Sequence, residues 1–448
     1  MCNQTNPLHV GFGRAIMTPT EPVHLSGGSD PKRISNNILD DMTVTCIAIT
    51  DETDRTILLL TEDMQHVTAS FAEPAIQGIV EVTGIPFEDI ILCATHTHSV
   101  PTQNLKFPGV EAFYPIYKEA FKKAALEAMA DRSPAQMLTG VTHADGYVNP
   151  RHYVLDDGSL MGSAYGVQSD KRIVRHTYPG DTTIQLVRFD REEKKSILLM
   201  NLGSHATFNG NSSKLDVSAD FPSPLRAYIE ANSDCQVAYF LGAGGDQTPQ
   251  SRFKAIAHGL NYIGYGEKIG SFVLEAQRFM QPAKPGKLQM KHMIHVGQCN
   301  RAGLERLDDA EKVTEIMITE GVAAATPVAK ELGFASIYEA RAIYGRSKLP
   351  ETQDVELAAM SIGEVSFIFG SFEMFSDTGR YIREHSPFYM TFIATQALNT
   401  HSYIPSDIAF EIGCYEAYAS QFQQGTAKLI ADTYIETLKE MKQRSLKL

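Results

Sequence analysis

The chain has 448 residues, of which 43% are hydrophobic and 21% charged, so it can bury a sizeable core and is not a disordered chain. Its formal net charge is −13, and it contains no run of Lys and Arg. That balance argues against nucleic-acid binding, which depends on basic contacts to phosphates. We therefore expect a globular protein with a small-molecule substrate, acting as a monomer or as a homo-oligomer.

The cysteines and the first residues bear on where the protein works. None of the six cysteines lies at Cys-x-x-Cys spacing, which is typical of isolated thiols in a reducing compartment. The first residues lack the basic and apolar segments of a signal peptide. No apolar run approaches the roughly 18 residues that a membrane-spanning helix needs. The sequence thus predicts a cytoplasmic protein without stable membrane insertion.

The first half of the chain alternates short β-branched, apolar runs with helical patterns. Strand pairs separated by charged turns predict two hairpins, and single apolar runs predict buried strands. Apolar residues at helical spacing predict amphipathic helices. The predicted hairpins lie at 43–49 with 56–60 and at 182–189 with 196–202, the strands at 89–94 and 236–241, and the helices at 71–83, 111–131 and 265–279.

The second half continues this mixture, and the hairpins decide the fold class. It predicts strands at 287–295 and 388–393, a hairpin at 358–370, a helix-rich stretch at 305–344 and one long helix over most of 413–444. A regular (β/α) barrel would not contain so many hairpins. We expect a mixed α/β (α+β) protein in which mixed β-sheets are stacked and helices pack on the outside, forming one large domain over residues 1–448.

Four predicted strands end in the same way, with a small or apolar residue followed by a potential metal ligand. Catalytic groups concentrate where rigid strands pass into loops. The first of these ends, Thr95-His96-Thr97-His98, places two imidazoles two residues apart, which in an extended segment would face the same side. The four ligands at these ends are His96, His205, Asp246 and Glu373.

Taken singly, each of these residues also has an ordinary structural explanation. His205 could be a hydrogen-bonded core histidine, and Asp246 could cap the following turn. Glu373 could be a carboxylate favoured by the dipole in the first turn of a helix, and Tyr403 a packed aromatic. Only together do these residues indicate a common functional site.

As a set, with the residues around them, they resemble the catalytic domain of the neutral/alkaline (non-lysosomal) ceramidase family. The similarity extends over about residues 8–430. The matching motifs, in chain order, are residues 11–19 beginning Gly11-Phe12-Gly13, residues 95–99, 201–207, 218–222, 244–249 and 370–373, and residues 403–406 with Tyr415-Glu416.

The resemblance implies a zinc-dependent amidase with one Zn²⁺. The family's metal ligands match His96, His205, Glu373 and Tyr403, and the residue that faces the substrate carbonyl matches His98. Thr248 stands where the family has a serine, and Asp246 precedes it in the same motif. Asp246 or His98 is better suited than Glu373 to carry a proton to the leaving group.

Departures from the family pattern bear on the substrate. Pro150 interrupts the family's Asn-Arg pair, so that Arg151 corresponds to an oxyanion or substrate contact across an insertion. The chain ends in a predicted helix, so we expect it to lack the family's C-terminal immunoglobulin-like domain, and we expect no export signal. We therefore expect the metal chemistry to be shared, and the substrate to be a small soluble amide, ester or lactone.

Other interpretations of these residues exist. A barrel amidohydrolase also begins with His-x-His, but the hairpins argue against it; the metallo-β-lactamase signature is broken after His98. A non-catalytic metalloprotein could keep the site as a ligand-binding module. An isomerase or lyase could use the same metal without adding water.

Overall fold

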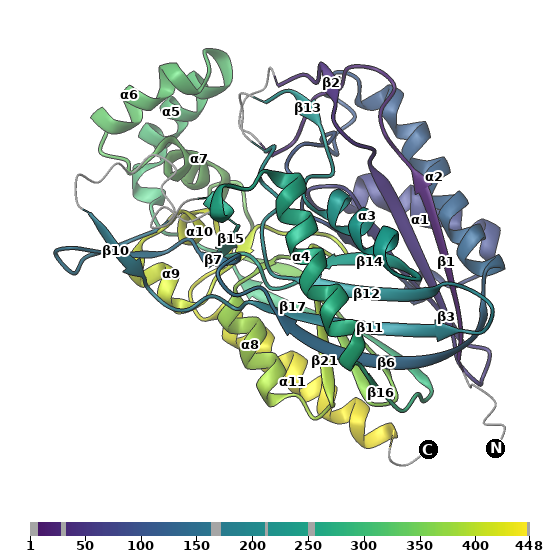
Figure 1. Cartoon of the computed structure of the whole chain (residues 1–448). Coiled ribbons are helices and arrows are strands. Elements are labelled where there is room, and N and C mark those ends of the chain that lie inside the picture. The colour runs from purple at the N-terminus through teal and green to yellow at the C-terminus, as the bar shows by residue number, and fades with distance from the viewer. Residues whose placement is uncertain (1–7, 28–32, 163–171, 211–213, 250–255, 446–448) are drawn as a thin grey trace.

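The computed structural model describes residues 8–27, 33–162, 172–210, 214–249 and 256–445. The largest unit of the fold is a mixed nine-stranded sheet (Figure 1). Its strands run in the order β14-β12-β11-β6-β1-β3-β4-β5, with β16 beside β6. They are β1 (Leu8–Ile16), β3 (Thr43–Thr50), β4 (Thr56–Glu62), β5 (Ile90–Ala94), β6 (Ser133–His143), β11 (Thr183–Arg191), β12 (Ser196–Leu202), β14 (Cys235–Leu241) and β16 (Gln281–Pro282).

This sheet is strongly curved, so that its two edges approach each other. The hydroxyl of Thr61 on β4 donates to the carbonyl of Tyr239 on β14 at 2.6 Å, although these strands lie near opposite ends of the strand order. β4 and β5 are parallel, as are β12 and β14. The carboxyl ends of β5 and β14 are thereby brought to the same side of the molecule.

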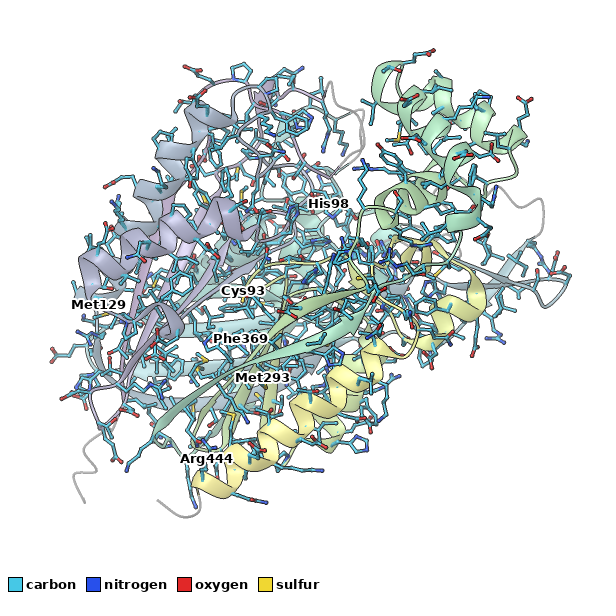
Figure 2. All side chains as sticks on the ribbon, turned by 180° about the vertical axis from the view of Figure 1, so that it is seen from behind. Cys93, His98, Met129, Met293, Phe369 and Arg444 are labelled. Carbon is cyan, nitrogen blue, oxygen red and sulfur yellow. The ribbon has the colours of Figure 1, made fainter. Side chains whose placement is uncertain are left out.

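A smaller sheet of β17 (Leu288–Gln298), β18 (Thr352–Ile362), β19 (Val365–Gly370) and β21 (Met390–Thr395) packs against the large one. Apolar side chains from the inner faces of both sheets form one buried cluster, including Phe189, Phe240 and Phe367. In Figure 2, Cys93 and Phe369 lie between the sheets, and Met293 lies between the small sheet and the long helix that carries Arg444. The predicted stacking of mixed sheets is confirmed.

Helices cover the outer face of each sheet and complete four layers. The large sheet is covered by α1 (Ala69–Thr83), α2 (Val110–Ala130), α3 (Pro222–Asn232) and α4 (Tyr262–Ala276), and the small one by α8 (Ser376–His385) and α11 (Thr426–Ser445). Gly11 and Gly13 allow β1 to lie directly against α2, because a Cβ there would collide with the carbonyls of Ala128 and Ala124.

A separate group of helices projects from these layers (Figure 1, upper left). It consists of α5 (Leu307–Thr319), α6 (Val322–Glu331) and α7 (Ile337–Arg346), which share their own apolar cluster around Val313, Ala329 and Ile343. The sequence predicted this helix-rich stretch. In the described ranges, no helix is both long and apolar enough to cross a membrane.

All three predicted hairpins form, as β3–β4, β11–β12 and β18–β19. One prediction needs correction: the segment at 413–444 is not one helix but α10 (Tyr415–Ala419) and α11, separated by residues 420–425. Gly425 lies between them with a φ of +89°, a left-handed conformation that helices do not contain.

Candidate metal centre

The loops that follow several strands converge on one point between the two sheets. Short pairings set the segments side by side: a bridge between Thr97 and Ala206 joins the loops after β5 and β12. The two-residue strands β20 (Glu373–Met374) and β22 (Tyr403–Ile404) run parallel, with Glu373 opposite Tyr403. The structure therefore brings all four sequence-predicted metal ligands into one neighbourhood.

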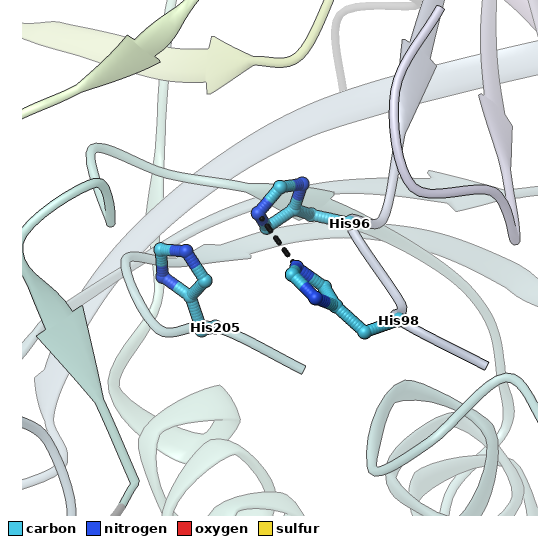
Figure 3. A group of neighbouring side chains, drawn as sticks. All are labelled: His96, His98 and His205. Atoms are coloured by element: carbon cyan, nitrogen blue, oxygen red, sulfur yellow. Dashed lines mark hydrogen bonds between the residues drawn. The ribbon is translucent and has the colours of Figure 1, made fainter. Parts of the chain in front are cut away.

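Three imidazoles form the centre of this neighbourhood (Figure 3). The Nε2 atoms of His96 and His98 are 3.1 Å apart, and the ring centroid of His205 lies 4.7 Å from that of His96. His96 and His205 are buried, whereas His98 is half-buried. His96 has a φ of +64°, so the segment is not extended as expected, and this strained conformation turns both rings toward the same point.

Backbone carbonyls fix which nitrogen of each buried imidazole faces inward. The Nδ1 of His96 lies 2.6 Å from the carbonyl oxygen of Gln65, and the Nδ1 of His205 lies 2.9 Å from that of Gly244. A carbonyl only accepts hydrogen bonds, so each Nδ1 carries the proton. Each Nε2 therefore presents a lone pair to the centre, as a metal-binding histidine does.

Two oxygen ligands complete the group. The Oε2 of Glu373 lies 3.4 Å from Nε2 of His96 and 3.0 Å from Nε2 of His205, and it is buried without a hydrogen-bond donor. The hydroxyl of Tyr403 lies 3.4 Å from Nε2 of His205. Lone pairs pointing at one another repel unless a cation or protons lie between them, so this donor set fits a metal ion.

Electrostatics favours a cation over protons at this point. Burial, together with the charge of Arg151, lowers the pKa of His205 to about 4, so its imidazole is neutral near pH 7. Burial opposes the ionisation of Glu373, and its pKa lies well below the usual range only if positive charge, on the adjacent imidazoles or on a bound cation, faces it. Burial also raises the pKa of Tyr403 well above its ordinary value, so a phenolate there would need a bound cation.

Arg151 lies beside this group and is held by a buried ion pair. Its Nη2 is 3.3 Å from the hydroxyl of Tyr403 and 2.7 Å from Oε1 of Glu416. The other carboxylate oxygen of Glu416 lies 3.3 Å from Nε2 of His152, whose Nδ1 lies 2.7 Å from the hydroxyl of Tyr178. A buried polar chain thus runs from Tyr403 through Arg151 to Tyr178.

Asp246 and Thr248 take different places around the centre. Both carboxylate oxygens of Asp246 are occupied: Oδ1 accepts from the Ser376 amide at 2.7 Å, and Oδ2 accepts from the Ser376 hydroxyl at 2.6 Å and from Tyr178 at 3.0 Å. Asp246 therefore holds the start of α8, and its catalytic role stays a prediction. Thr248 is buried on β15 (Gln247–Thr248), opposite Asn149 of β7 (Asn149–Pro150).

His66, which is not among the sequence-predicted site residues, also belongs to this neighbourhood. Burial and the nearby His96 lower its pKa to about 4, and Glu373 acts on it in the opposite direction. The signal was present, because His66 follows β4, the parallel neighbour of β5, just as His96 follows β5.

A second cluster that could hold a metal ion consists of His152, Cys414 and Glu416, all buried. Both ring nitrogens of His152 already have partners, in Tyr178 and Glu416. This cluster is therefore satisfied by hydrogen bonds.

Comparison with known proteins identifies the fold. A solved structure described as ceramidase complexed with C2 matches with a TM-score of 0.72 and 14% identity, covering 98% of this chain and 76% of that one. The crystal structure of neutral ceramidase from Pseudomonas aeruginosa matches with a TM-score of 0.71 and 13% identity, covering 98% and 75%. No family model and no curated protein matches the sequence. The chain has a neutral ceramidase-like fold, which confirms the resemblance.

Proposed function

We propose that this protein is a metal-dependent hydrolase that holds one Zn²⁺ with His96, His205, Glu373 and Tyr403. The observation that carries the proposal is the buried Oε2 of Glu373, which faces two imidazole lone pairs and has no hydrogen-bond donor. Nitrogen and carboxylate ligands suit zinc, and a phenolate adds a hard oxygen ligand. The ceramidase-like fold is consistent with cleavage of an amide bond.

When bound, zinc lowers the pKa of a water molecule to about 7 and polarises a carbonyl group. The protein's own residues would bind the substrate carbonyl and the charge that develops on it. The Nε2 of His98 lies 3.1 Å from Nε2 of His96, so its imidazole lies beside the proposed metal ligands. With the His96 lone pair engaged by the metal, the His98 ring would contact the substrate carbonyl and the oxyanion that develops on it.

Arg151 and Thr248 would support the same step. The guanidinium of Arg151 is fixed by Glu416 and contacts Tyr403, so its positive charge is held near the centre without rearrangement. Preorganised charge of this kind stabilises a developing oxyanion. Thr248 follows Gln247, whose carbonyl lies 3.0 Å from Nδ1 of His205, and its hydroxyl would contact the substrate.

The substrate is proposed to be a small soluble amide, ester or lactone. A cavity of about 690 Å³ has Gln65 and His66 in its wall, next to the candidate ligands. That volume lies within the range of small-molecule sites.

The experiment is to measure bound metal and then to assay a panel of amides, esters and lactones by mass spectrometry. We expect about one zinc per chain and products that are heavier in sum by one water. His96→Ala should lose both the metal and the activity, whereas His9→Ala, at an exposed residue of β1, should keep both. Equal metal content in the His96 variant would disprove the metal site, and a product of unchanged mass would indicate an isomerase instead.

A further inference from the structure

The cavity next to the candidate metal centre has two chemically different walls. One wall is formed by loops of the stacked sheets, with Gly27, Gln65 and His66, and the other by α5 and α7 of the projecting helices. It is adjacent to the centre, because the carbonyl of the lining residue Gln65 lies 2.6 Å from Nδ1 of His96. Gly27 lies directly against His98, because a Cβ at this glycine would collide with the His98 backbone. In Figure 2, His98 lies on the side of the sheets that faces the projecting helices.

The charge along this cavity differs from that of the whole chain. Its described lining residues include Arg341 and Lys348 but no Asp or Glu, whereas the chain carries a formal net charge of −13. Arg341 belongs to α7, and Lys348 follows two residues after the end of that helix. The ammonium of Lys348 is further placed by the ring of Tyr344, with its Nζ 3.8 Å from the ring centroid.

The remainder of the lining is largely apolar. Leu25 and Phe107 line it from the sheet side, and Met317 and Ile318 line it from α5. Ile318 is 60% exposed, so an apolar side chain is accessible at this part of the lining. The cavity thus offers an apolar space with positive charge along one wall, next to the candidate metal centre.

We propose that this cavity binds a substrate with an apolar body and a negatively charged end group, of which a carboxylate is the simplest case. The scissile carbonyl would lie at His98 and the anionic end at Arg341 and Lys348. This inference rests on the proposed hydrolase function and specifies its substrate class. The two cations act as specificity residues, which attract and orient the substrate and take no part in the bond-breaking step.

The test uses matched pairs of chromogenic amides that differ only in the end of the acyl chain. Glutaryl and suberyl p-nitroanilides carry a terminal carboxylate, and pentanoyl and octanoyl p-nitroanilides end in a methyl group. For the zinc-loaded wild type, we expect a higher kcat/KM for the charged member of at least one pair. The double variant Arg341→Gln, Lys348→Gln should reduce that preference about fivefold, and more at low salt, while the neutral amides are hydrolysed as before.

Lys330→Gln is the matched control, because it removes an exposed positive charge from the same helical group at a residue that does not line the cavity. It should leave the preference unchanged. Calorimetric binding of glutarate and suberate gives a readout that does not require turnover, and the double variant should weaken it similarly.

The possible failures can be told apart. Hydrolysis of the neutral amides with no preference for the charged ones, or a preference that survives in the double variant, would overturn the inference and leave the hydrolase proposal standing. Absence of any hydrolysis across the wider panel would overturn the hydrolase proposal. If glutarate and suberate also fail to bind in the calorimetric experiment, the anionic subsite is disproved without any measurement of hydrolysis.

Discussion

Glu416 and Arg151 form a buried ion pair next to Tyr403: Oε1 of Glu416 lies 2.7 Å from Nη2 of Arg151, and that same Nη2 lies 3.3 Å from the Tyr403 hydroxyl. The guanidinium therefore connects a carboxylate outside the centre to a candidate metal ligand inside it. Partners at this distance from a metal orient its ligands and tune their basicity. A substitution of Glu416, although it is not itself a candidate ligand, should therefore change the rate of the chemical step.

Glu416→Gln should lower kcat by about 10- to 100-fold, because loss of the carboxylate charge frees Arg151 to shift away from the site of the developing oxyanion. The amide keeps a similar volume, so we expect a folded protein with normal zinc content. Glu230→Gln, which breaks the ion pair of Arg14 with Glu230 at 3.0 Å, is the matched control and should keep its activity. Equal kcat in both variants would remove Arg151 from the proposed mechanism.

The same carboxylate should make the protein sensitive to acid. Burial alone would raise the pKa of Glu416, but Arg151 and His152 outweigh it and lower the pKa from 4.5 to about 2. Because the folded pKa is the lower one, the stabilisation is complete above about pH 4.5 and is lost as the pH falls toward 2. Above about pH 4.5, the ionised Glu416 contributes about 3 kcal/mol to the free energy of unfolding.

Denaturant unfolding of the wild type and of Glu416→Gln across this pH range measures the effect. The free energy of unfolding of the wild type should fall more steeply than that of the variant, and the two curves should approach each other at low pH. Curves that stay parallel from pH 5 to pH 2 would mean that Glu416 is not ionised in the folded protein.

The sequence was most informative where short-range patterns decide the structure. His96, His205 and Glu373 each follow a predicted strand, and the structure brings their side chains together. It also contains the three predicted hairpins, which depend only on neighbouring residues and the turn between them. In a hairpin, the turn also determines which residues of the two strands pair.

Long-range pairings could not be derived in this way. β1 and β6 were not predicted: glycines at positions 11 and 13 weaken the strand pattern of β1, and Pro134 at the start of β6 suggests a break. Tyr403 reaches the centre only because β22 pairs with β20, and nothing in the spacing to Glu373 indicates that pairing. Its assignment came from the family resemblance.

The division of roles between His98 and His205 is testable, because His96, His98 and His205 form a group that could itself hold a metal ion. His205 is buried and faces Glu373, whereas His98 is half-buried and adjoins Gly27 of the cavity wall. His205→Ala should therefore lose bound zinc, while His98→Ala should retain it and lose at least about 100-fold in kcat.

Zinc content per chain and kcat/KM of the two variants, measured at the same total zinc, check this division. His143→Ala, at an exposed residue of β6, serves as the control for histidine removal. Zinc loss in His98→Ala comparable to that in His205→Ala would make His98 a metal ligand and leave the oxyanion contact to Arg151.

Asp246→Asn should act mainly on stability. The two oxygens of Asp246 accept three hydrogen bonds from Ser376 and Tyr178, and one oxygen of an asparagine would be replaced by an NH₂ group that cannot accept. Leaving buried donors unsatisfied at the start of α8 should cost about 1–3 kcal/mol, measured as a lower midpoint of unfolding. Below that midpoint, kcat should stay within about threefold of the wild type.

Asp377→Asn is the matched control, because Asp377 lies in the first turn of the same helix and accepts from Thr378 instead. A fully stable Asp246→Asn protein with kcat reduced by more than about 100-fold would show that this carboxylate acts in catalysis, as its sequence motif suggests.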